Sequence, residues 1–362
     1  MDMDMDSTND QANDQRKVGD DDNNTLLIGF DFGTSWTVVM TNRGHKERIR
    51  SVVGYPRDMI GVKLLGAPYL VGEAAFEKRS FVDLRAPLQD GVIREYVERD
   101  LEVARHLVSH VIESLSPRPD DEVCVIVGSP ARATNTSKDL LAQIFQEVVD
   151  EVQVLSEPFL VAYGYDSLVN NLVIDIGAGT VDLCALKGAM PGQNSQVTVN
   201  QAGNFVDEQL EALITEVYPD VQMNTHVARA IKEKSGYVGD APSQITADLR
   251  ANGRPVSYDV TQMVGQACEM LIPGIIEGID RLIQSCPPED QAEMLRNILV
   301  AGGGSRIIGI DTYIQAALVD YYGDVVVKCV DDPVFAVARG ALKLATELPP
   351  RYWEKLGNVT DY

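Results

Sequence analysis

Two segments of this chain repeat the same order of parts. Residues 25–41 read TLLIGFDFGTSWTVVMT, and residues 171–187 read NLVIDIGAGTVDLCALK. In each segment an apolar run ends near an Asp, a tight turn with glycine follows, and a second run rich in β-branched residues begins. Such runs on either side of a short glycine turn predict a β-hairpin. Because the two copies are separated by the length of a domain, they predict an internal duplication.

Each predicted hairpin is followed by further elements of matching kind. A third β-like run stands at 48–53 after the first hairpin and at 196–202 after the second. Apolar residues at helical spacing predict helices around 101–115 and 140–148, and the short apolar run at 123–127 predicts a buried strand. The sequence therefore predicts an α/β fold of two similar domains, each opening with a three-stranded meander.

A third glycine-rich segment lies later in the chain. Residues 298–305 read ILVAGGGS, which predicts a buried strand that runs into a helix through three glycines. Glycine lets the backbone approach a ligand closely, and free N–H groups at a helix start attract anions. Alone, such a turn is equally well explained as a sharp strand-to-helix corner. Its significance comes from the two hairpins.

The turns of the two hairpins have the composition of a phosphate site. Successive backbone N–H groups in a glycine-rich turn form a concave nest for phosphate oxygens, and Thr or Ser hydroxyls add donors. Asp31 and Asp175 stand at the end of the first strand of each hairpin. There they predict a Mg²⁺ site that works mostly through water. The alternative, two ordinary hairpins with turn residues, is weakened by the repetition and by the third glycine loop.

Missing motifs and charge exclude other classes of protein. The chain has no G-x-x-x-x-G-K-[ST] segment and no strand followed by G-x-G-x-x-G. Its 54 acidic residues outnumber 31 basic ones, and the net charge is −23. Such a surface repels phosphate backbones and anionic lipids, so we expect no nucleic-acid partner and no direct membrane insertion. With no export-signal pattern and no long apolar run, the expected location is the cytoplasm.

Residues 1–22 form a separate acidic segment. They contain eight Asp against two basic residues and have no apolar cluster. A segment of this kind cannot bury enough apolar surface to offset the entropy that ordering costs. The sequence predicts a disordered acidic tail.

Longer strings resemble one protein superfamily. IGFDFGTSWTVV and VIDIGAGTVDL resemble the two phosphate motifs of the actin, heat-shock-70 and sugar-kinase superfamily. VLSEPFLVAYG (154–164) resembles its connecting motif, VAGGGSRIIGI (300–310) its adenosine motif, and AIKEKSGYVG (230–239) the adenosine-contacting helix of actin. SVVGYPRDMIGVKLLG and ELPPRYWEKLG are similar to bacterial actins associated with magnetosomes. Over about residues 25–347, the chain is identified as a member of the bacterial actin-like proteins.

The resemblance implies an actin-like ATPase fold of the α/β class. Two duplicated RNase H-like domains would surround a nucleotide cleft, each with a smaller inserted subdomain. Domain I would comprise residues 23–157 and 333–350, with its small subdomain at about 53–92. Domain II would comprise residues 158–332, with its small subdomain at about 208–258. Residues 351–362 would form a polar C-terminal tail.

The resemblance also implies catalytic and metal-binding residues, with ATP or ADP and Mg²⁺ as cofactors. Glu157 would orient the attacking water, and Asp175 is the second catalytic residue. Both, together with Asp31, would hold Mg²⁺ largely through water. Pro158 is a good first helical residue, so Glu157 stands at a helix start, where we expect its carboxylate to stay ionised. Without the other motifs, Glu157 would be explained as a stabiliser of that helix start.

Nucleotide contacts follow from the same resemblance. No lysine stands in the first phosphate hairpin, where Thr37 and Val38 occupy the stretch, so phosphate contact there would rest on backbone and hydroxyl groups. Lys232 and Glu233, taken alone, are explained as a solvated helix face. The implied nucleotide-binding residues are Gly33, Thr34, Ser35, Gly177, Gly179, Thr180, Gly203, Lys232, Glu233, Gly302, Gly303, Gly304 and Ser305.

The function implied by the resemblance is that of a polymerising cytoskeletal ATPase. ATP–Mg²⁺ binding would favour filament assembly and hydrolysis would promote disassembly, and the filament would organise, position and segregate magnetosome chains. Its partners would be further copies of the chain and magnetosome-associated adaptor proteins, in the cytoplasm alongside magnetosomes. Two alternatives remain: a soluble small-metabolite kinase of the same superfamily, and a nucleotide-gated adaptor that does not polymerise.

Overall fold

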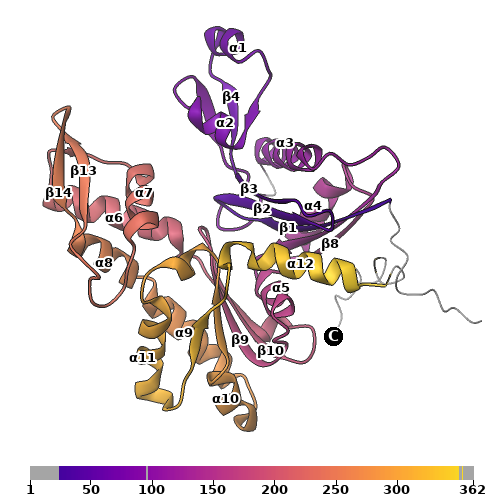
Figure 1. Ribbon diagram of the computed structural model, residues 1–362, viewed down its shortest axis with the longest axis vertical. Coiled ribbons are helices and arrows are strands. Elements are labelled where there is room, and N and C mark those ends of the chain that lie inside the picture. Colours follow the sequence, from indigo (N-terminus) through magenta and orange to yellow (C-terminus); the bar gives the residue numbers. More distant parts are fainter. Residues whose placement is uncertain (1–23, 95–96, 350–352, 354–362) are drawn as a thin grey trace, which may run out of the picture.

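The computed structural model describes residues 24–94, 97–349 and 353. It has two five-stranded sheets, which lie at the centres of two lobes (Figure 1). We call residues 24–156 lobe I and residues 169–329 lobe II. The predicted tail at 1–22 lies outside the described residues, as does the predicted tail at 351–362 apart from Trp353. Trp353 is buried, 7% exposed, in an apolar cluster with residues of both sheets.

The sheet of lobe I has the strand order β3-β2-β1-β7-β8. β1, β2 and β3 form an antiparallel meander, and β7 and β8 continue the sheet parallel to β1. Asp31 pairs with Val38, which places its carboxylate close to the hairpin turn. The strands are β1 (Thr25–Phe32), β2 (Trp36–Thr41), β3 (Lys46–Arg50), β7 (Glu122–Ser129) and β8 (Glu151–Ser156).

The sheet of lobe II repeats this arrangement with the order β11-β10-β9-β15-β16. β9, β10 and β11 are antiparallel neighbours, and β15 and β16 are parallel to β9. The predicted duplication is therefore confirmed, strand by strand. The strands are β9 (Val169–Ile176), β10 (Val181–Lys187), β11 (Gln196–Val199), β15 (Ile298–Ala301) and β16 (Val327–Cys329).

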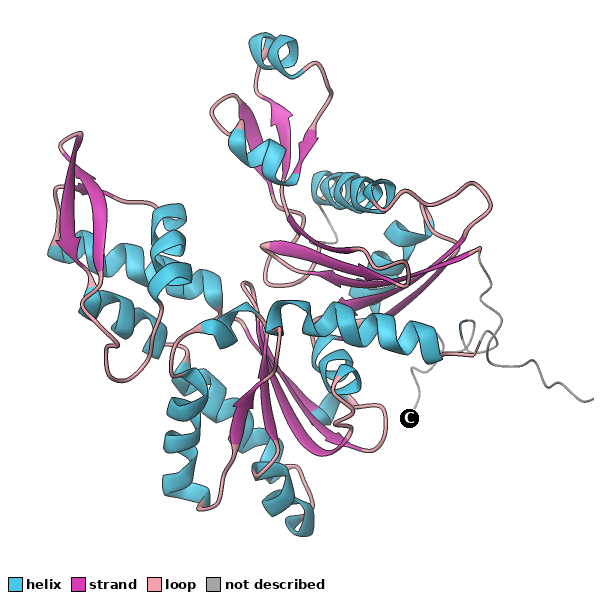
Figure 2. Ribbon diagram, in the orientation of Figure 1, coloured by secondary structure: helices cyan, strands magenta, loops and turns pink. Residues whose placement is uncertain are grey.

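Helices cover the two sheets (Figure 2). In lobe I, alternate residues of β7 face two different layers: Val125 and Val127 join the cluster of α3 (Glu98–Ser114) and α4 (Asn135–Gln146). Cys124 and Ile126 join the cluster of α5 (Glu157–Gly164) and α12 (Ala336–Glu347). A strand covered on both faces reads as one continuous apolar run, as 123–127 does. In lobe II, the sheet packs against α9 (Ile272–Gln284), α10 (Pro288–Leu295) and α11 (Ile310–Tyr322).

The helices α5 and α12 connect the lobes and cross in close contact. α5 leads from β8 of lobe I to β9 of lobe II, and α12 returns the chain from lobe II to pack on β1. At the crossing, Gly164 faces Gly340, and a Cβ at Gly340 would lie 1.7 Å from the carbonyl oxygen of Leu160. Because no side chain fits there, the two backbones approach to a distance that only glycine permits.

Each lobe carries a smaller set of elements at its outer end (Figure 1). The limits assigned from the sequence to the two domains and their small subdomains stay predictions. No helix among the described residues is long and apolar enough to span a membrane. In lobe I the set is β4 (Val53–Pro56), α1 (Met59–Leu65), β5 (Leu70–Val71), α2 (Gly72–Glu77) and β6 (Val82–Arg85). In lobe II it is α6 (Gly203–Val217), β12 (Val221–Gln222), α7 (Thr225–Ser235), β13 (Thr246–Ala251), β14 (Arg254–Asp259) and α8 (Thr261–Glu269). Short 3₁₀ helices are η1 (Gln193–Ser195), η2 (Gly303–Arg306) and η3 (Pro333–Phe335).

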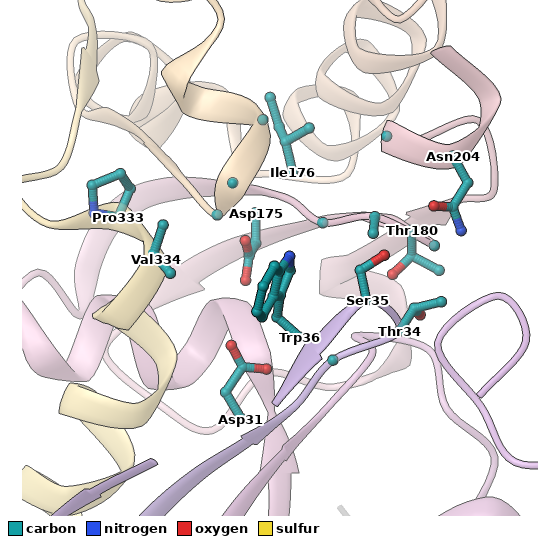
Figure 3. Close-up of a pocket in the computed structure, with 18 of the residues that line it drawn as sticks. Asp31, Thr34, Ser35, Trp36, Asp175, Ile176, Thr180, Asn204, Pro333 and Val334 are labelled. Carbon is teal, nitrogen blue, oxygen red and sulfur yellow. The ribbon is translucent and has the colours of Figure 1, made fainter. Parts of the chain in front are cut away.

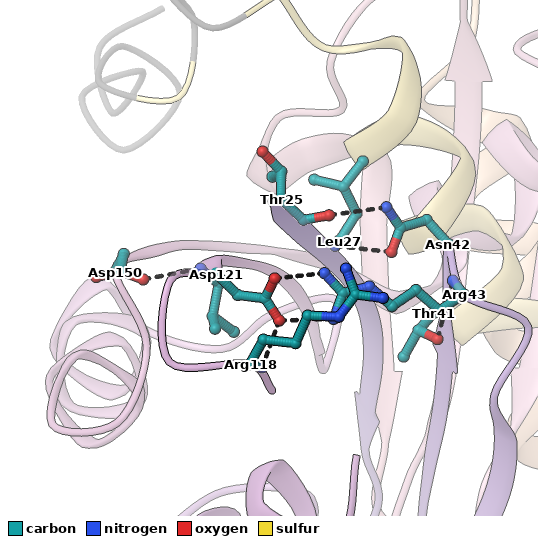
Figure 4. Close-up of polar contacts among 9 residues, drawn as sticks. Thr25, Leu27, Thr41, Asn42, Arg43, Arg118, Asp121 and Asp150 are labelled. Carbon is teal, nitrogen blue, oxygen red and sulfur yellow. Dashed lines mark hydrogen bonds and ion pairs between the residues drawn. The ribbon is translucent and has the colours of Figure 1, made fainter. Parts of the chain in front are cut away.

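The start of β1 is fixed by polar contacts from neighbouring strands (Figure 4). The Asn42 amide accepts a hydrogen bond from the Leu27 N–H at 3.1 Å and donates to the Thr25 carbonyl at 3.0 Å. The Arg43 guanidinium forms a bidentate pair with Asp121 at 2.6 and 2.5 Å. Hydrogen bonding to Arg43 lowers the pKa of Asp121 to about 2. The turn between β2 and β3 is thereby tied to the loop before β7.

Candidate functional site

A cavity of about 300 Å³ lies between the two lobes, with walls from both of them. Lobe I supplies the hairpin turn before β2, and lobe II supplies the turn before β10, the start of α6, α7 and the triple-glycine loop. The structure thus brings together segments that are far apart in the chain. The sequence-predicted residues that line the cavity are Asp31, Gly33, Thr34, Ser35, Glu157, Asp175, Gly177, Gly179, Thr180, Gly203, Lys232, Glu233, Gly302, Gly303 and Gly304.

Ser305 is the predicted site residue that does not line the cavity. Its side chain is buried, 7% exposed, and its hydroxyl donates to the Gly302 carbonyl at 2.8 Å. The reason for this difference from the sequence expectation is the 3₁₀ turn η2, which directs the Ser305 hydroxyl back onto the loop. Ser305 therefore closes the triple-glycine turn.

The two hairpin turns meet at the cavity. A Cβ at Gly179 would lie 2.5 Å from the Thr34 hydroxyl and 3.0 Å from the Gly91 nitrogen, so glycine permits this close approach. Within the second turn, the Gly177 N–H donates to the Thr180 carbonyl at 2.9 Å. In the first, the Gly33 carbonyl accepts from the Ser51 hydroxyl at 2.6 Å. The resulting wall has backbone and hydroxyl groups of both lobes side by side.

Carboxylates form the floor of the cavity. Figure 3 shows Asp31 and Asp175 pointing into it from opposite lobes. Burial raises the pKa of Asp31 to about 7. Burial and the charges of Asp31 and Asp182 raise the pKa of Asp175 well above its usual range. Among the described residues no basic side chain forms an ion pair with Asp31 or Asp175.

Glu157 stands at the first residue of α5, as predicted from Pro158. Its side chain packs over Gly128 of β7 and reaches the cavity. The surroundings of Glu157 in the protein without ligands oppose the expectation that the helix start favours its ionised form. Burial, and then the charges of Asp31, Asp182 and Asp175, raise the pKa of Glu157 well above its usual range. The effect of three neighbouring carboxylates and of desolvation exceeds that of one helix terminus.

The same carboxylates fit a divalent cation held at a distance. Asp31, Glu157 and Asp175 are oxygen donors of the kind that Mg²⁺ prefers, and a positive charge would return their pKa values toward the usual range. Within residues 24–94, 97–349 and 353, no group of three acidic, His or Cys side chains is close enough to hold a metal directly. The three carboxylates therefore fit a Mg²⁺ ion, and contact with that ion through water stays a prediction.

The start of α6 and the inner face of α7 form the side of the cavity in lobe II. The Lys232 ammonium donates to the Gly203 carbonyl at 2.6 Å and pairs with Asp207 at 2.6 Å. Arg229 also pairs with Asp207, at 2.8 Å, and donates to the Asn204 amide oxygen at 2.8 Å. Asp207 is fully buried. Lys232 thus connects α6 to α7 at the cavity wall. It is not part of a solvated helix face, the alternative that the sequence alone left open.

Sequence reasoning missed five charged or aromatic residues of the lining: Phe32, Trp36, Arg48, Arg229 and Arg306. Trp36 follows the first turn directly, and the Arg48 guanidinium lies over its indole at 3.7 Å from the ring centroid. Position relative to the turn was a usable signal for Trp36. Arg48 is reached only through the pairing of β3 with β2, which no local motif shows.

Comparison with known proteins assigns the fold and the family. The MreB/Mbl protein family model matches residues 25–350. The curated protein called Actin-like protein MamK of Paramagnetospirillum magneticum is 53% identical over 337 residues, which cover 93% of this chain and 97% of that protein. The protein of the same name from Magnetospirillum gryphiswaldense is 54% identical, with 93% of each chain covered.

Solved structures agree with these relatives. A structure described as a MamK double helical filament matches with a TM-score of 0.88 and 53% identity, covering 90% of this chain and 100% of that chain. A non-polymerising MamK mutant bound to AMPPNP matches with a TM-score of 0.70 and 53% identity, covering 89% and 99%. The predicted actin-like fold and the resemblance to bacterial actins are confirmed, and the chain belongs to the MreB/Mbl protein family.

Proposed function

We propose that this protein is an ATP-dependent actin-like protein that assembles into filaments and hydrolyses ATP, with ATP or ADP and Mg²⁺ as its ligands. The observation that carries the proposal is the meeting of two duplicated hairpin turns, one from each lobe, at one cavity. Relatives that are more than half identical over nearly the whole chain add support. One MamK structure is a double helical filament, and another is a non-polymerising mutant bound to AMPPNP.

The phosphate groups of the nucleotide would lie between the two turns. Both turns line that space, and their backbone N–H groups other than that of Gly177, together with the Thr34 hydroxyl, would donate to the phosphates. Because the donors come from both lobes, a bound triphosphate favours the arrangement in which the lobes are close. Loss of the terminal phosphate removes contacts from one lobe or both, and this would weaken the filament.

Glu157 is the residue we assign to the attacking water. It reaches the cavity from α5, where Asp31 and Asp175 also point. As a proton acceptor it must be ionised, and its raised pKa in the ligand-free protein opposes this. Mg²⁺, when bound, supplies the positive charge that favours the ionised carboxylates. Asp175 is the second residue we assign to catalysis.

In the cell, we propose a cytoplasmic filament that organises, positions and segregates magnetosome chains. This part rests on the resemblance to magnetosome-associated bacterial actins and on 53–54% sequence identity to the MamK proteins of Paramagnetospirillum magneticum and Magnetospirillum gryphiswaldense. Its partners would be further copies of the chain and adaptor proteins on magnetosomes. Imaging of magnetosome chains in cells that lack the protein tests this role, and undisturbed chain position and inheritance would contradict it.

Electron microscopy and pelleting of the purified chain with Mg²⁺–ATP, Mg²⁺–AMPPNP and Mg²⁺–ADP test the biochemical proposal. We expect filaments with ATP and AMPPNP, with shorter-lived filaments in ATP. ATP turnover that requires an added small molecule, without polymer, would indicate a metabolite kinase instead. Tight nucleotide binding without polymer under any condition would indicate a nucleotide-gated adaptor.

A further inference from the structure

Arg48 and Trp36 form a pair on the cavity side of the lobe I sheet. Trp36 opposes Arg50 in the pairing of β2 with β3, so Arg48 is its diagonal neighbour on the same face. Val38, which opposes Arg48, also lines the cavity, and this identifies the face as the one toward the nucleotide site. The Arg48 guanidinium lies 3.7 Å from the indole centroid, within the range of a cation–π contact.

Arg48 is the cation that lobe I contributes to the cavity. Among the described residues of 24–156, the lining includes no other Lys or Arg. Two cations of lobe II, Arg229 and Lys232, are already paired with Asp207. Within the described part of the chain, the Arg48 side chain forms no ion pair with a carboxylate and donates no hydrogen bond to a carbonyl. Its charge therefore faces the cavity without an acceptor of its own.

Groups of lobe II face Arg48 across the cavity. Partial burial lowers the pKa of Arg48, the charge of Glu233 on α7 raises it, and the charges of Arg306 on η2 and of Arg50 lower it. Glu233 and Arg306 also line the cavity. A ligand that enters between α7, η2 and β3 thus meets Arg48 on the side of lobe I.

The first hairpin has no basic residue, and its neighbouring positions cannot supply one. Thr37 is buried with its hydroxyl 3.0 Å from that of Ser51, and Val38 is buried as well. A di- or triphosphate brings several negative charges, and a charge-assisted hydrogen bond to a guanidinium is stronger than one to a neutral donor. The cation that the turn lacks can reach the same space from β3.

We propose that Arg48, held on the Trp36 indole, contacts the polyphosphate of the bound nucleotide and is a positioning residue of lobe I for the nucleoside di- or triphosphate. The proposal rests on the proposed function, because it assumes that the cavity binds a nucleotide. The indole keeps the flexible Arg48 side chain over the cavity, which lowers the entropy lost when the phosphate binds.

The test is calorimetric titration of the full chain with Mg²⁺–ADP and, separately, with adenosine, which has no phosphate. Arg48→Ala should weaken Mg²⁺–ADP binding about tenfold and leave adenosine binding unchanged. Arg48→Lys should weaken Mg²⁺–ADP binding less, because it keeps the charge and loses the planar fork. Arg48 is at most partly buried and belongs to none of the apolar clusters, so its removal leaves the core intact.

Arg50→Ala is the matched control. Arg50 is on the same strand and lies 4.5 Å from the Trp36 centroid, but it pairs with Glu73 at 3.0 Å and does not line the cavity. This variant should bind Mg²⁺–ADP within about twofold of wild type, because the Arg50 guanidinium already has an acceptor in Glu73 and lies outside the cavity lining. Equal losses of affinity in Arg48→Ala and Arg50→Ala would overturn the proposal, because they would show that any positive charge on β3 has the same effect.

Trp36 gives a second readout. Its emission should change when Mg²⁺–ADP binds, and Trp36→Phe should remove that change while Trp353 still emits. Combining Arg48→Ala with Trp36→Ala should cost no more affinity than the larger single loss, because the indole acts through Arg48. Wild-type affinity of Arg48→Ala, or an equal loss for adenosine, would overturn the inference alone. Failure of the wild-type chain to bind any nucleotide would overturn the proposed function with it.

Discussion

The backbone N–H of Ala131 donates to the Asp182 carboxylate at 2.8 Å, across the boundary between the lobes. Ala131 follows β7 of lobe I, and Asp182 belongs to β10 of lobe II. The Thr198 hydroxyl donates to the same oxygen at 2.6 Å, and Asp182 is fully buried. A buried N–H without an acceptor is costly, so this contact fixes the lobes at one point behind the cavity.

Asp182→Ala should therefore lower the free energy of unfolding by about 1–3 kcal/mol, because the buried Ala131 N–H and the part-buried Thr198 hydroxyl lose their acceptor. Asp182→Asn is the matched variant, and it should cost less because its carbonyl oxygen still accepts both hydrogen bonds. Urea unfolding of the nucleotide-free protein measures both. Equal losses in the two variants would contradict the role of the oxygen as an acceptor.

Glu157→Ala should hydrolyse ATP about 10²–10⁴-fold more slowly, because the attacking water loses its proton acceptor. Assembly should persist, since the phosphate contacts of both turns remain, and the filaments should be long-lived. Phosphate release and pelleting in the same samples measure the two effects. Asp175→Ala should impair both hydrolysis and Mg²⁺-dependent binding. Prompt disassembly of Glu157→Ala filaments, or undiminished hydrolysis, would count against the assignment.

Gly340→Ala should lower the free energy of unfolding by about 1–3 kcal/mol or more, because its Cβ would collide with the Leu160 carbonyl. Gly192→Ala is a suitable control, since a Cβ there meets no atom within 4 Å and its φ is −81°. It should stay within about 0.5 kcal/mol of wild type. Thermal or urea unfolding decides, and a neutral Gly340→Ala would show that the helix crossing can relax.

The Arg43–Asp121 pair predicts a pH dependence. The folded-state pKa of Asp121 is lowered from 3.8 to about 2, so its contribution to stability is fully present above pH 4. That contribution is lost as the pH falls through 2. In Arg43→Ala the pKa of Asp121 should return toward 3.8, and part of the acid sensitivity between pH 4 and 2 should disappear. Carboxyl NMR titration of wild type and variant measures this directly. An unchanged Asp121 pKa in the variant would contradict the pairing.

Assembly should depend on salt, because subunits that each carry −23 repel one another. Screening acts over about 10 Å at 0.1 M salt, so moderate salt or divalent ions should lower the critical concentration. Deleting residues 1–22, which hold eight Asp and two basic residues, should ease assembly at low salt. Light scattering at several salt concentrations compares the two chains. An equal or higher critical concentration after deletion would refute the expectation.

The parts of the fold that the sequence predicted are those encoded locally. A hairpin with its glycine turn, or the strand before Gly302, is specified within about ten residues, and its repetition showed the duplication. The residues around the cavity came from the same motifs, and their joint position followed from the duplicated topology. The orientation of Ser305 depended on a single 3₁₀ turn, which the run of three glycines did not specify.

What the sequence did not predict depends on contacts between distant segments. Asp182 stands two residues after Thr180 in the second turn, but its partner Ala131 is in the other lobe. The raised pKa of Glu157 arises first from burial and then from carboxylates on three other strands, which its helix start alone does not reveal. Arg48 reaches the cavity through strand pairing. Each of these depends on tertiary neighbours, which a single sequence does not reveal.

The glycine crossing of α5 and α12 is a close contact between the two helices that connect the lobes. A rotation of one lobe against the other would therefore turn about this crossing. The crossing lies near the cavity, because α5 begins at the lining residue Glu157 and α12 follows the lining residues Pro333 and Val334. The ligand contacts therefore lie close to the crossing, whereas α1 and the β13–β14 hairpin lie at the outer ends of the lobes, far from it (Figure 1). A rotation too small to break the crossing would still displace those outer tips by a much larger distance.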